Sequence, residues 1–255
     1  MNSRQSHILE RLIAGNEVSV QDLAARFGVS EMTVRRDLVR LEREGELTRT
    51  HGGAVLSKAG VIEFAFKEKE KHFAAEKKAI AREVASFIHP GMTLTLDTGT
   101  TTLEVARAIV GIKNLTVLTS SLAIASALYV YDHIELVLLG GTVRKGNPDL
   151  SGRLTEENLK CFRVDLALIG ADGADPAGVY TTDMNIACVS QWMISGAAQT
   201  VLALDHSKFE KTAFVKFALW DRIDRVITDD GVPPRVRKWL NKSVREVIYA
   251  QGGEK

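Results

Sequence analysis

Arginine side chains that could bind a nucleic acid gather near the amino terminus of the chain. Residues 1–57 contain eight arginines, no lysine and eight acidic residues, so this segment is neutral overall. Five of the arginines lie between residues 35 and 49. A guanidinium group is planar and can donate two hydrogen bonds at once to a phosphate or to the edge of a guanine base. The cluster therefore indicates DNA binding, and it leaves open the alternative of salt bridges on a helix surface.

A second group of residues could bind an anion. The apolar residues 94–96 predict a strand, and the sequence Asp-Thr-Gly-Thr-Thr follows it where a helix is predicted to begin. Free N–H groups and the positive dipole end at a helix start attract anions such as phosphate. No lysine follows as in a loop that binds a nucleoside triphosphate. The loop predicts a phosphate site, unless its threonines only cap the helix. Its residues are Asp97, Thr98, Gly99, Thr100 and Thr101.

Polar loops also follow other predicted strands. Residues 119–121, 140–144, 170–175 and 205–208 place glycine, hydroxyl or charged groups just after apolar stretches. Loops at the carboxyl ends of parallel strands meet at one edge of the sheet, where such folds bind ligands. Basic side chains there could bind a phosphate and aspartates could accept from sugar hydroxyls. For the lysine of the last loop, a solvated surface position is the alternative. The candidate residues are Ser120, Gly141, Arg144, Asp172, Gly173, Asp205 and Lys208.

The thiol and imidazole groups do not indicate a metal site. The two cysteines, Cys161 and Cys188, lie far apart and form no Cys-x-x-Cys pair, and no histidines lie at the spacing of zinc ligands. We therefore expect no metal, no disulfide framework and a reducing cytosol.

Composition predicts an ordinary folded protein. The chain has 255 residues, of which 45% are hydrophobic and 25% charged, with a formal net charge of +1. This length suits one or two domains with real cores. No apolar stretch reaches the roughly 18 residues of a membrane span, and the amino terminus lacks the pattern of a signal peptide. We expect a cytoplasmic protein with no membrane contact.

The elements that must position the arginines can be predicted from periodicity. Apolar residues at helical spacing predict helices within 8–13, 20–27 and 34–41. Gly28 suits the turn after the second helix and Ser30 suits the N-cap of the third. Residues 46–50 can run extended before a turn at 51–53, which makes a helix-turn-helix with a wing. The side chains left free to contact DNA are Ser30, Thr33, Arg35, Arg36 and Arg40 on the third helix, and Arg49 and His51 on the wing.

After residue 75 the pattern alternates between strands and helices. Strands are predicted within 94–96, 115–118, 134–139, 166–169, 201–204 and 226–228, with helical patterns between most of them. Such alternation predicts βαβ units and a mostly parallel sheet, which is an α/β fold. We therefore expect a DNA-binding domain over residues 1–57, a linker over 58–75 and a second domain over 76–255.

The amino-terminal motif resembles that of a known family. The stretch reads VSVQDLAARFGVSEMTVRRDLVRLEREGELTRTHGGAV, with the core Ser30-x-x-Thr33-Val34-Arg35-Arg36-Asp37-Leu38 followed by Arg49-x-His51-Gly52-Gly53. It closely resembles the DNA-binding domain of the DeoR family of bacterial transcriptional repressors. The resemblance implies a winged helix-turn-helix fold.

The later loops resemble the sensor domain of the same family in their order. The resemblance implies a Rossmann-like fold of the ribose-5-phosphate isomerase and CoA-transferase group, and a phosphorylated sugar or polyol as effector. It places residues 97–101 at the phosphate end, and Asp172, Asp205 and Lys208 near the sugar end. Two departures leave the identity of the effector open, because Asn185 and Gln191 are neutral where the family often has an acidic and a basic residue. Ser120 also stands where asparagine is common.

We therefore expect a repressor of a carbohydrate or polyol catabolic operon that binds double-stranded operator DNA as a homodimer or homotetramer, with no cofactor. A phosphosugar isomerase is the alternative, because residues 170–175 resemble the acidic loop of those enzymes. Isomerisation needs a general base, and Asp183 is the only carboxylate in the corresponding stretch 178–185. We therefore do not expect catalysis.

Overall fold

The computed structural model of the protein describes residues 3–15, 17–56, 66, 68–144 and 147–252, and the chain forms two compact units. The first unit contains residues 1–68, and the second contains residues 69–144 and 148–255. Half of the linker that we predicted over 58–75, residues 58–65 and 67, lies outside the described residues. Its final part, residues 69–75, belongs to the second unit.

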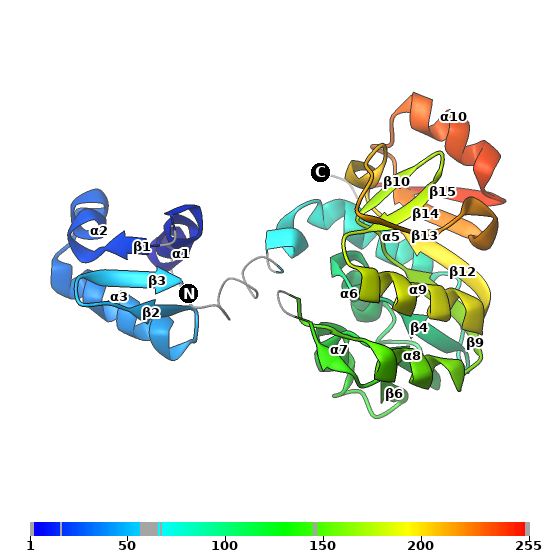
Figure 1. The fold of residues 1–255 in the computed structure, drawn as a ribbon, viewed down its shortest axis with the longest axis horizontal. Helices are drawn as coiled ribbons and strands as arrows, with labels where there is room; N and C mark the ends of the chain where they lie inside the picture. Colours follow the sequence, from blue (N-terminus) through cyan, green and yellow to red (C-terminus); the bar gives the residue numbers. More distant parts are fainter. Residues whose placement is uncertain (1–2, 16, 57–65, 67, 145–146, 253–255) are drawn as a thin grey trace. The chain divides into compact units, whose positions relative to one another are not determined.

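Within residues 3–15 and 17–56, the first unit contains the helices α1, α2 and α3 and a small antiparallel sheet (Figure 1). The strand order is β1-β3-β2, so the first strand pairs with the last one. The predicted helices and the wing strand are confirmed, whereas the first strand was not predicted. The elements are α1 (Ser3–Gly15), β1 (Glu17–Ser19), α2 (Val20–Phe27), α3 (Glu31–Arg43), β2 (Leu47–Arg49) and β3 (Gly53–Leu56).

The turn between α2 and α3 forms as its sequence predicts. Gly28 adopts φ +62° after α2, in the left-handed region that glycine enters without steric cost. The Ser30 hydroxyl then accepts a hydrogen bond from the Thr33 amide at 3.2 Å and caps α3. Val34, Leu38 and Leu41 of α3 are buried against the other two helices. These contacts fix the direction of α3, which carries four of the five arginines between residues 35 and 49.

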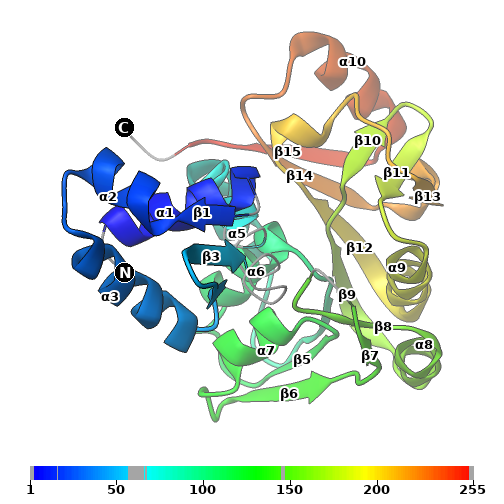
Figure 2. The same ribbon diagram turned by 60° about the vertical axis from the view of Figure 1, so that its left-hand side comes forward.

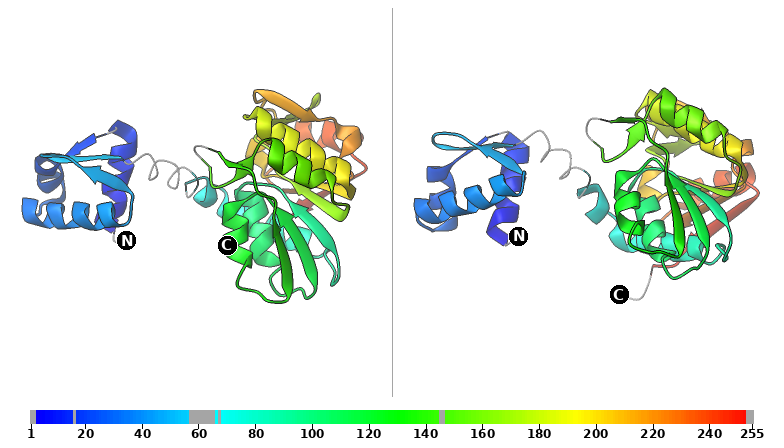
Figure 3. Two further views of the ribbon diagram at one scale, coloured as in Figure 1. Left: turned by 60° about the horizontal axis from the view of Figure 1, so that its bottom comes forward. Right: turned by 90° about the horizontal axis from the view of Figure 1, so that it is seen from below.

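The second unit contains a seven-stranded sheet whose neighbouring strands are all parallel, which confirms the predicted α/β fold. Its strands can be followed in Figure 3. Helices α5, α6 and α7 lie on one face, and α8 and α9 lie on the other (Figure 2). The order of the strands is β15-β14-β12-β9-β4-β5-β6. The elements are α5 (Ala74–Ala85), β4 (Thr93–Leu96), α6 (Thr100–Ala108), β5 (Leu115–Thr119), α7 (Leu122–Leu128), β6 (Ile134–Leu138), β7 (Thr142–Val143), β8 (Leu150–Ser151), α8 (Arg153–Lys160), β9 (Val164–Ile169), β10 (Gly173–Asp175), β11 (Gly178–Thr181), α9 (Met184–Gly196), β12 (Ala197–Ala203), η1 (His206–Lys208), β13 (Val215–Ala218), η2 (Trp220–Arg222), β14 (Arg225–Asp229), α10 (Pro234–Ser243) and β15 (Glu246–Ala250).

The direction of the chain across this sheet reverses between two central strands. After β4 the chain builds β5 and β6 on one side, and β9 then returns to pair with the other side of β4. The loops that leave β4 and β9 therefore diverge from neighbouring strands. In open parallel sheets this switch point is where ligands bind, outside the carboxyl ends of the strands.

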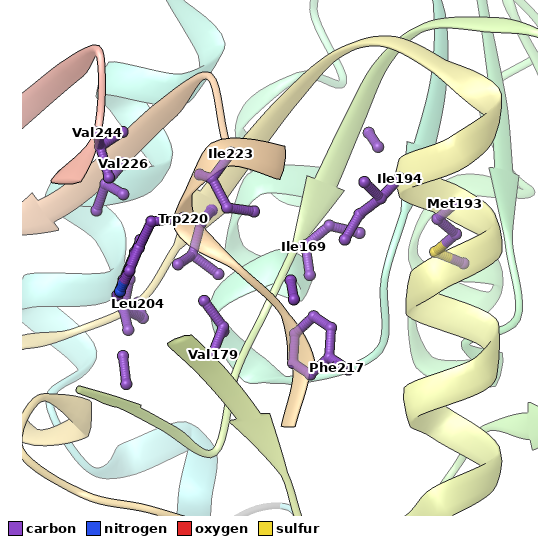
Figure 4. Close-up of a cluster of buried hydrophobic side chains, with 14 of the residues drawn as sticks. Ile169, Val179, Met193, Ile194, Leu204, Phe217, Trp220, Ile223, Val226 and Val244 are labelled. Carbon is purple, nitrogen blue, oxygen red and sulfur yellow. The ribbon is translucent and has the colours of Figure 1, made fainter. Parts of the chain in front are cut away.

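A small sheet of order β10-β11-β13 packs over the main one. Figure 4 shows Val179 of β11 and Phe217 of β13 beside Ile169 of β9, within the large hydrophobic core of the second unit. Trp220 lies in the same core, and its indole N–H donates to the Asp175 carbonyl at 2.9 Å. This packing holds the loop between β9 and β10 in place at the switch point.

Candidate functional site

Some of the exposed arginines of the first unit form salt bridges with neighbouring glutamates, and others do not. Arg35 pairs with Glu31 at 3.5 Å and Arg40 with Glu44 at 3.0 Å. Arg49 pairs with Glu42 at 2.6 Å, and its backbone N–H donates to the same carboxylate. The salt-bridge alternative therefore holds for these three residues. Exposed pairs of this kind contribute at most about 1 kcal/mol and open easily when a phosphate competes.

Arg36 is exposed and has no ion pair with any residue that the structure describes. It lies in the second turn of α3, on the solvent side opposite the buried Val34 and Leu38. A guanidinium group in this position can reach DNA without first breaking a salt bridge. Among the predicted DNA-binding residues, Arg36 is therefore the best placed for a specific contact.

The other predicted DNA-binding residues lie on the same helix or on the wing. The hydroxyls of Ser30 and Thr33 are 2.9 Å apart and both belong to the cap of α3, so they mark its amino-terminal end. His51 is exposed in the turn between β2 and β3, beside Arg49 at the end of β2. The structure thus brings the helix group and the wing group onto two neighbouring parts of one unit.

Sequence reasoning missed the residue that anchors α3. Asp37 is buried within α3, where its carboxylate accepts from Arg4 Nε at 2.6 Å and from Gln5 Nε2 at 3.1 Å. A carboxylate this deeply buried needs such partners, because desolvation would otherwise be costly. Arg4 is thereby committed to joining α1 to α3. An aspartate on the same helix face as Val34 and Leu41 was the available signal.

In the second unit, Asp97 lies at the switch point and ties three elements together. It is 3% exposed. Its carboxylate accepts from the Thr98 amide at 2.7 Å, from the Gly170 amide at 3.2 Å and from the Ser190 hydroxyl at 3.3 Å. These donors come from the loop after β4, the loop after β9 and helix α9. Burial raises the pKa of Asp97 to about 7, against the opposing effect of the three hydrogen bonds. Asp97 therefore positions the loops, with its carboxylate turned inward.

The helix start after Asp97 is open to an anion. Gly99 is the N-cap of α6 with φ +128°, and no side chain of the described residues caps the helix. The alternative that the threonines only serve as caps is therefore not supported for Thr98 and Thr101. The Thr100 hydroxyl lies 3.5 Å from the Lys69 carbonyl, and the Thr102 hydroxyl donates to the Gly99 carbonyl at 3.0 Å. The first-turn N–H groups of α6 are oriented as in anion-binding helix starts.

A buried lysine that sequence reasoning missed lies close to this helix start. Lys77 is 3% exposed, and its ammonium donates to the carbonyls of Lys69 and of His72, the latter at 2.6 Å. Burial lowers its pKa, the nearby charge of Lys208 lowers it further, and Asp205 opposes both effects. Lys77 occupies the apolar stripe of α5 with Ile80 and Val84, and that position was the signal in the sequence.

The structure brings the predicted Asp205 and Lys208 to the same place. Asp205 follows β12, is buried, and accepts from the Ser207 amide at 3.0 Å as the N-cap of η1. The charges of both residues act on the pKa of Lys77, which Asp205 raises and Lys208 lowers. The charges of Glu104 and Glu70 also act to raise the pKa of Lys77, so its ammonium lies among both acidic and basic groups.

Asp172 lies in the loop after β9. Its carboxylate accepts from the Thr182 amide and hydroxyl, both at 2.9 Å, and from the Thr181 hydroxyl at 3.1 Å. Burial acts to raise the pKa of Asp172, but these hydrogen bonds and the charge of Lys69 outweigh it and hold the pKa below its ordinary value. Asp172 is therefore an ionised acceptor in the loop after β9.

Of the remaining predicted residues, Arg144, Gly141 and Gly173 are engaged by the chain itself. Arg144 forms two hydrogen bonds with the buried Asp149, at 2.8 and 2.6 Å. A Cβ atom on Gly141 would lie 2.1 Å from the Thr155 hydroxyl, and one on Gly173 would lie 2.3 Å from the Lys211 carbonyl. The chain's own packing thus accounts for both glycines. Ser120 is fully buried after β5, and its hydroxyl has no partner among the described residues.

The two departures from the family pattern lie on α9 but face different surroundings. Gln191 donates to the Phe217 carbonyl at 3.2 Å and lines a groove with Trp192 beside β13. Ser190 of the same helix contacts Asp97 instead. Asn185 is exposed in the first turn, where Asp183 caps the helix through the Asn185 amide at 2.8 Å. The carboxylate of Asp183, which the isomerase alternative needs as a base, is therefore occupied as a cap.

The described residues lack the features of two other kinds of site. No group of three or more histidine, cysteine, aspartate or glutamate residues there could hold a metal ion. Within the same residues, no helix is long and apolar enough to cross a membrane.

Comparison with known proteins assigns both units to one family. Residues 4–59 match the DeoR-like helix-turn-helix domain and residues 72–230 match the DeoR C terminal sensor domain. The chain is 33% identical to the glycerol-3-phosphate regulon repressor of Escherichia coli K12, over 93% of this chain and 94% of that protein. It is 35% identical to the transcriptional repressor GlcR of Bacillus subtilis, over 87% of this chain and 86% of that protein.

The likeness to solved structures is weaker. A D-ribose-5-phosphate isomerase in complex with phospho-erythronic acid shares 18% identity over 52% of each chain, with a TM-score of 0.40. A likeness of this size carries no argument about activity. The curated relatives named above are transcriptional repressors.

Proposed function

Because the chain belongs to the DeoR family of transcriptional regulators, we propose that it represses a carbohydrate or polyol catabolic operon under the control of a phosphorylated sugar or polyol. The relatives that it matches include the glycerol-3-phosphate regulon repressor of Escherichia coli K12. Its name refers to a phosphorylated polyol. The proposal extends that chemical class to the effector of this chain.

The single observation that carries the effector proposal is the uncapped start of α6 at the switch point, with the buried ammonium of Lys77 close to it. The Lys69 carbonyl accepts from the Lys77 ammonium and lies 3.5 Å from the Thr100 hydroxyl, and the charge of Lys208 also acts on Lys77. Phosphate suits such a site, because helix-start N–H groups and ammonium groups both donate to its oxygens. Asp172 and Asp205 would accept from the hydroxyls of the sugar or polyol, and the unpartnered hydroxyl of Ser120 offers one further contact.

The roles of the other residues in this proposal follow from their surroundings. Asp97, Gly141, Arg144 and Gly173 shape the site through the chain's own contacts. Thr98, Gly99, Thr100 and Thr101 supply the first-turn N–H groups and hydroxyls. In the first unit, α3 enters the major groove of double-stranded operator DNA, and the wing residues Arg49 and His51 contact the backbone.

A thermal-shift panel of phosphorylated sugars and polyols, each beside its unphosphorylated parent, tests the effector class. A compound present at about 100 times its Kd adds about 2.7 kcal/mol to the free energy of unfolding. For a unit of this size that corresponds to a rise in Tm of roughly 5–10 °C. We expect the rise with a phosphorylated compound and not with its parent. Equal rises with both members of a pair would contradict the phosphate site.

Replacing Arg36 by alanine tests the DNA contact. Loss of a bidentate base contact should weaken the complex with its best operator by about 1–3 kcal/mol, a factor of roughly 5 to 150. The operator can be selected from random duplexes with the wild-type protein, and the selected sites should carry repeated half-sites if it binds as a homodimer or homotetramer. Fluorescence anisotropy titration gives the affinity.

The matched control for that experiment is Arg82→Ala, which removes the same charge from an exposed position on α5 of the second unit. It should leave operator affinity within about twofold, as is usual for surface substitutions away from a contact. Equal losses in Arg36→Ala and Arg82→Ala would show that only net charge matters, and would remove Arg36 from the specific interface.

A further inference from the structure

Residues 69–73, which we call the 69–73 segment, begin the second unit and contact several parts of the proposed effector site. The Lys69 carbonyl accepts from the Lys77 ammonium and lies 3.5 Å from the Thr100 hydroxyl. The charge of Lys69 also acts on Asp172. The Phe73 ring packs edge-on against the ring of His206, at 4.8 Å between centroids. The segment thus contacts the first residue of α6 and the first residue of η1.

The backbone at the end of this segment is strained. Phe73 has φ +55°, in the left-handed region that a bulky side chain rarely adopts, and its ring is 38% exposed. Strain of this kind persists only where surrounding contacts impose it, and it recurs at switch regions. Two hydrogen bonds hold the backbone in this conformation. The Lys77 amide donates to the Phe73 carbonyl at 3.0 Å, and the Lys77 ammonium donates to the His72 carbonyl at 2.6 Å.

A second tether joins the segment to α6. Glu70 accepts from Arg107 at 2.5 Å, and Arg107 also pairs with Glu104 at 2.5 Å. Arg107 and Thr100 lie on the helix whose start forms the proposed anion site. The segment is therefore held from two directions, by the buried ammonium of Lys77 and by α6.

We propose that the 69–73 segment is the switch through which an anionic effector alters DNA binding, a proposal that rests on the proposed function. The Lys77 ammonium has three donors, and the carbonyls of Lys69 and His72 use two of them. A phosphate at the start of α6 competes for this ammonium, because a charge-assisted bond to an anion is stronger than one to a neutral carbonyl.

Effector binding then loosens the hold on the two carbonyls and lets Phe73 leave its strained conformation. The chain that precedes this segment leads to the first unit, so the change alters the restraint on the DNA-binding helices. An effector can shift DNA binding only through such a difference between two states of the protein.

Hydrogen exchange of the full chain, followed by mass spectrometry, tests the proposal with inorganic phosphate and glycerol 3-phosphate as probes and chloride of matched ionic strength as control. We expect protection to rise at residues 97–103 and to change at residues 69–76. Protection at 97–103 without change at 69–76 overturns the switch and leaves the proposed function intact. No change at either place counts against the proposed effector class and against the switch with it.

A pair of variants tests the same proposal through DNA binding. The measured quantity is the ratio of operator affinities without and with glycerol 3-phosphate, which should be about fivefold or more in the wild type. Phe73→Ala removes the contact with His206, and we expect the ratio to fall to within about twofold of one. Phe214→Ala removes an equally large ring that is 78% exposed elsewhere on the second unit, and should keep the wild-type ratio. A wild-type ratio in Phe73→Ala, or a ratio of one in the wild type, overturns the proposal.

Discussion

Replacing Gly53 by alanine should abolish operator binding while leaving the second unit folded. A Cβ atom at this position would lie 1.8 Å from the Val18 carbonyl oxygen and 2.8 Å from its carbon. Both atoms belong to the backbone of β1, which pairs with β3 at this point through Ser19 and Gly53. No side-chain rotation relieves such a clash, so the two strands must separate.

The expected cost is large in relation to the stability of the first unit. A core clash typically costs about 1–3 kcal/mol, and one between backbones costs more. At about 0.05–0.15 kcal/mol per residue, a unit of this size has only several kcal/mol in total. We therefore expect operator affinity to fall by a factor of about 100 or more, measured by anisotropy. Calorimetry should show the transition of the second unit unchanged.

The adjacent residue provides the matched control. A Cβ atom on Gly52 would meet no atom within 4 Å, and its φ lies outside the left-handed region. Gly52→Ala should therefore change the unfolding free energy by no more than about 0.5 kcal/mol. If Gly53→Ala bound the operator as tightly as Gly52→Ala, the β1 and β3 pairing would not be required for DNA binding.

The stability of the second unit should fall as pH rises from about 4 to 7, because of Asp97. The pKa of this carboxyl is about 7 in the folded protein, against an ordinary value of 3.8. Between these pH values the carboxyl is ionised in the unfolded chain and still protonated in the folded chain. Unfolding therefore releases a proton, and a rise in pH favours it. The difference corresponds to about 4 kcal/mol, fully expressed above pH 7 and absent below pH 4.

Denaturant unfolding across this pH range measures the effect by comparison with Asp97→Asn, which has no proton to release. The difference in unfolding free energy between wild type and variant should change by several kcal/mol from pH 4 to pH 8. Asp165→Asn is the control, because hydrogen bonds from Thr93 lower the pKa of Asp165 and its contribution therefore changes only below pH 4. A constant difference for Asp97→Asn across the range would contradict the raised pKa.

Local features of the first unit could be predicted well from the sequence. Gly28 and Ser30 act within one turn of the helices that they end and begin, and residues three or four apart define the buried faces of α2 and α3. Strand β1 was missed because it has three residues and its pairing partner is β3, more than thirty residues away. The salt bridges of Arg35, Arg40 and Arg49 were left as an alternative, since spacing alone does not show which rotamers meet.

In the second unit, the sequence by itself determined the α/β class, because alternating strands and helices each have a local pattern. The candidate loops were also found, because they follow apolar stretches. Tertiary structure alone decided the strand order, which brings the loop after β9 against Asp97, and it buried the Lys77 ammonium against the carbonyls of Lys69 and His72. The physical reason is that turns and amphipathic faces depend on neighbours along the chain, whereas burial of a charge depends on elements that meet only after the sheet is assembled.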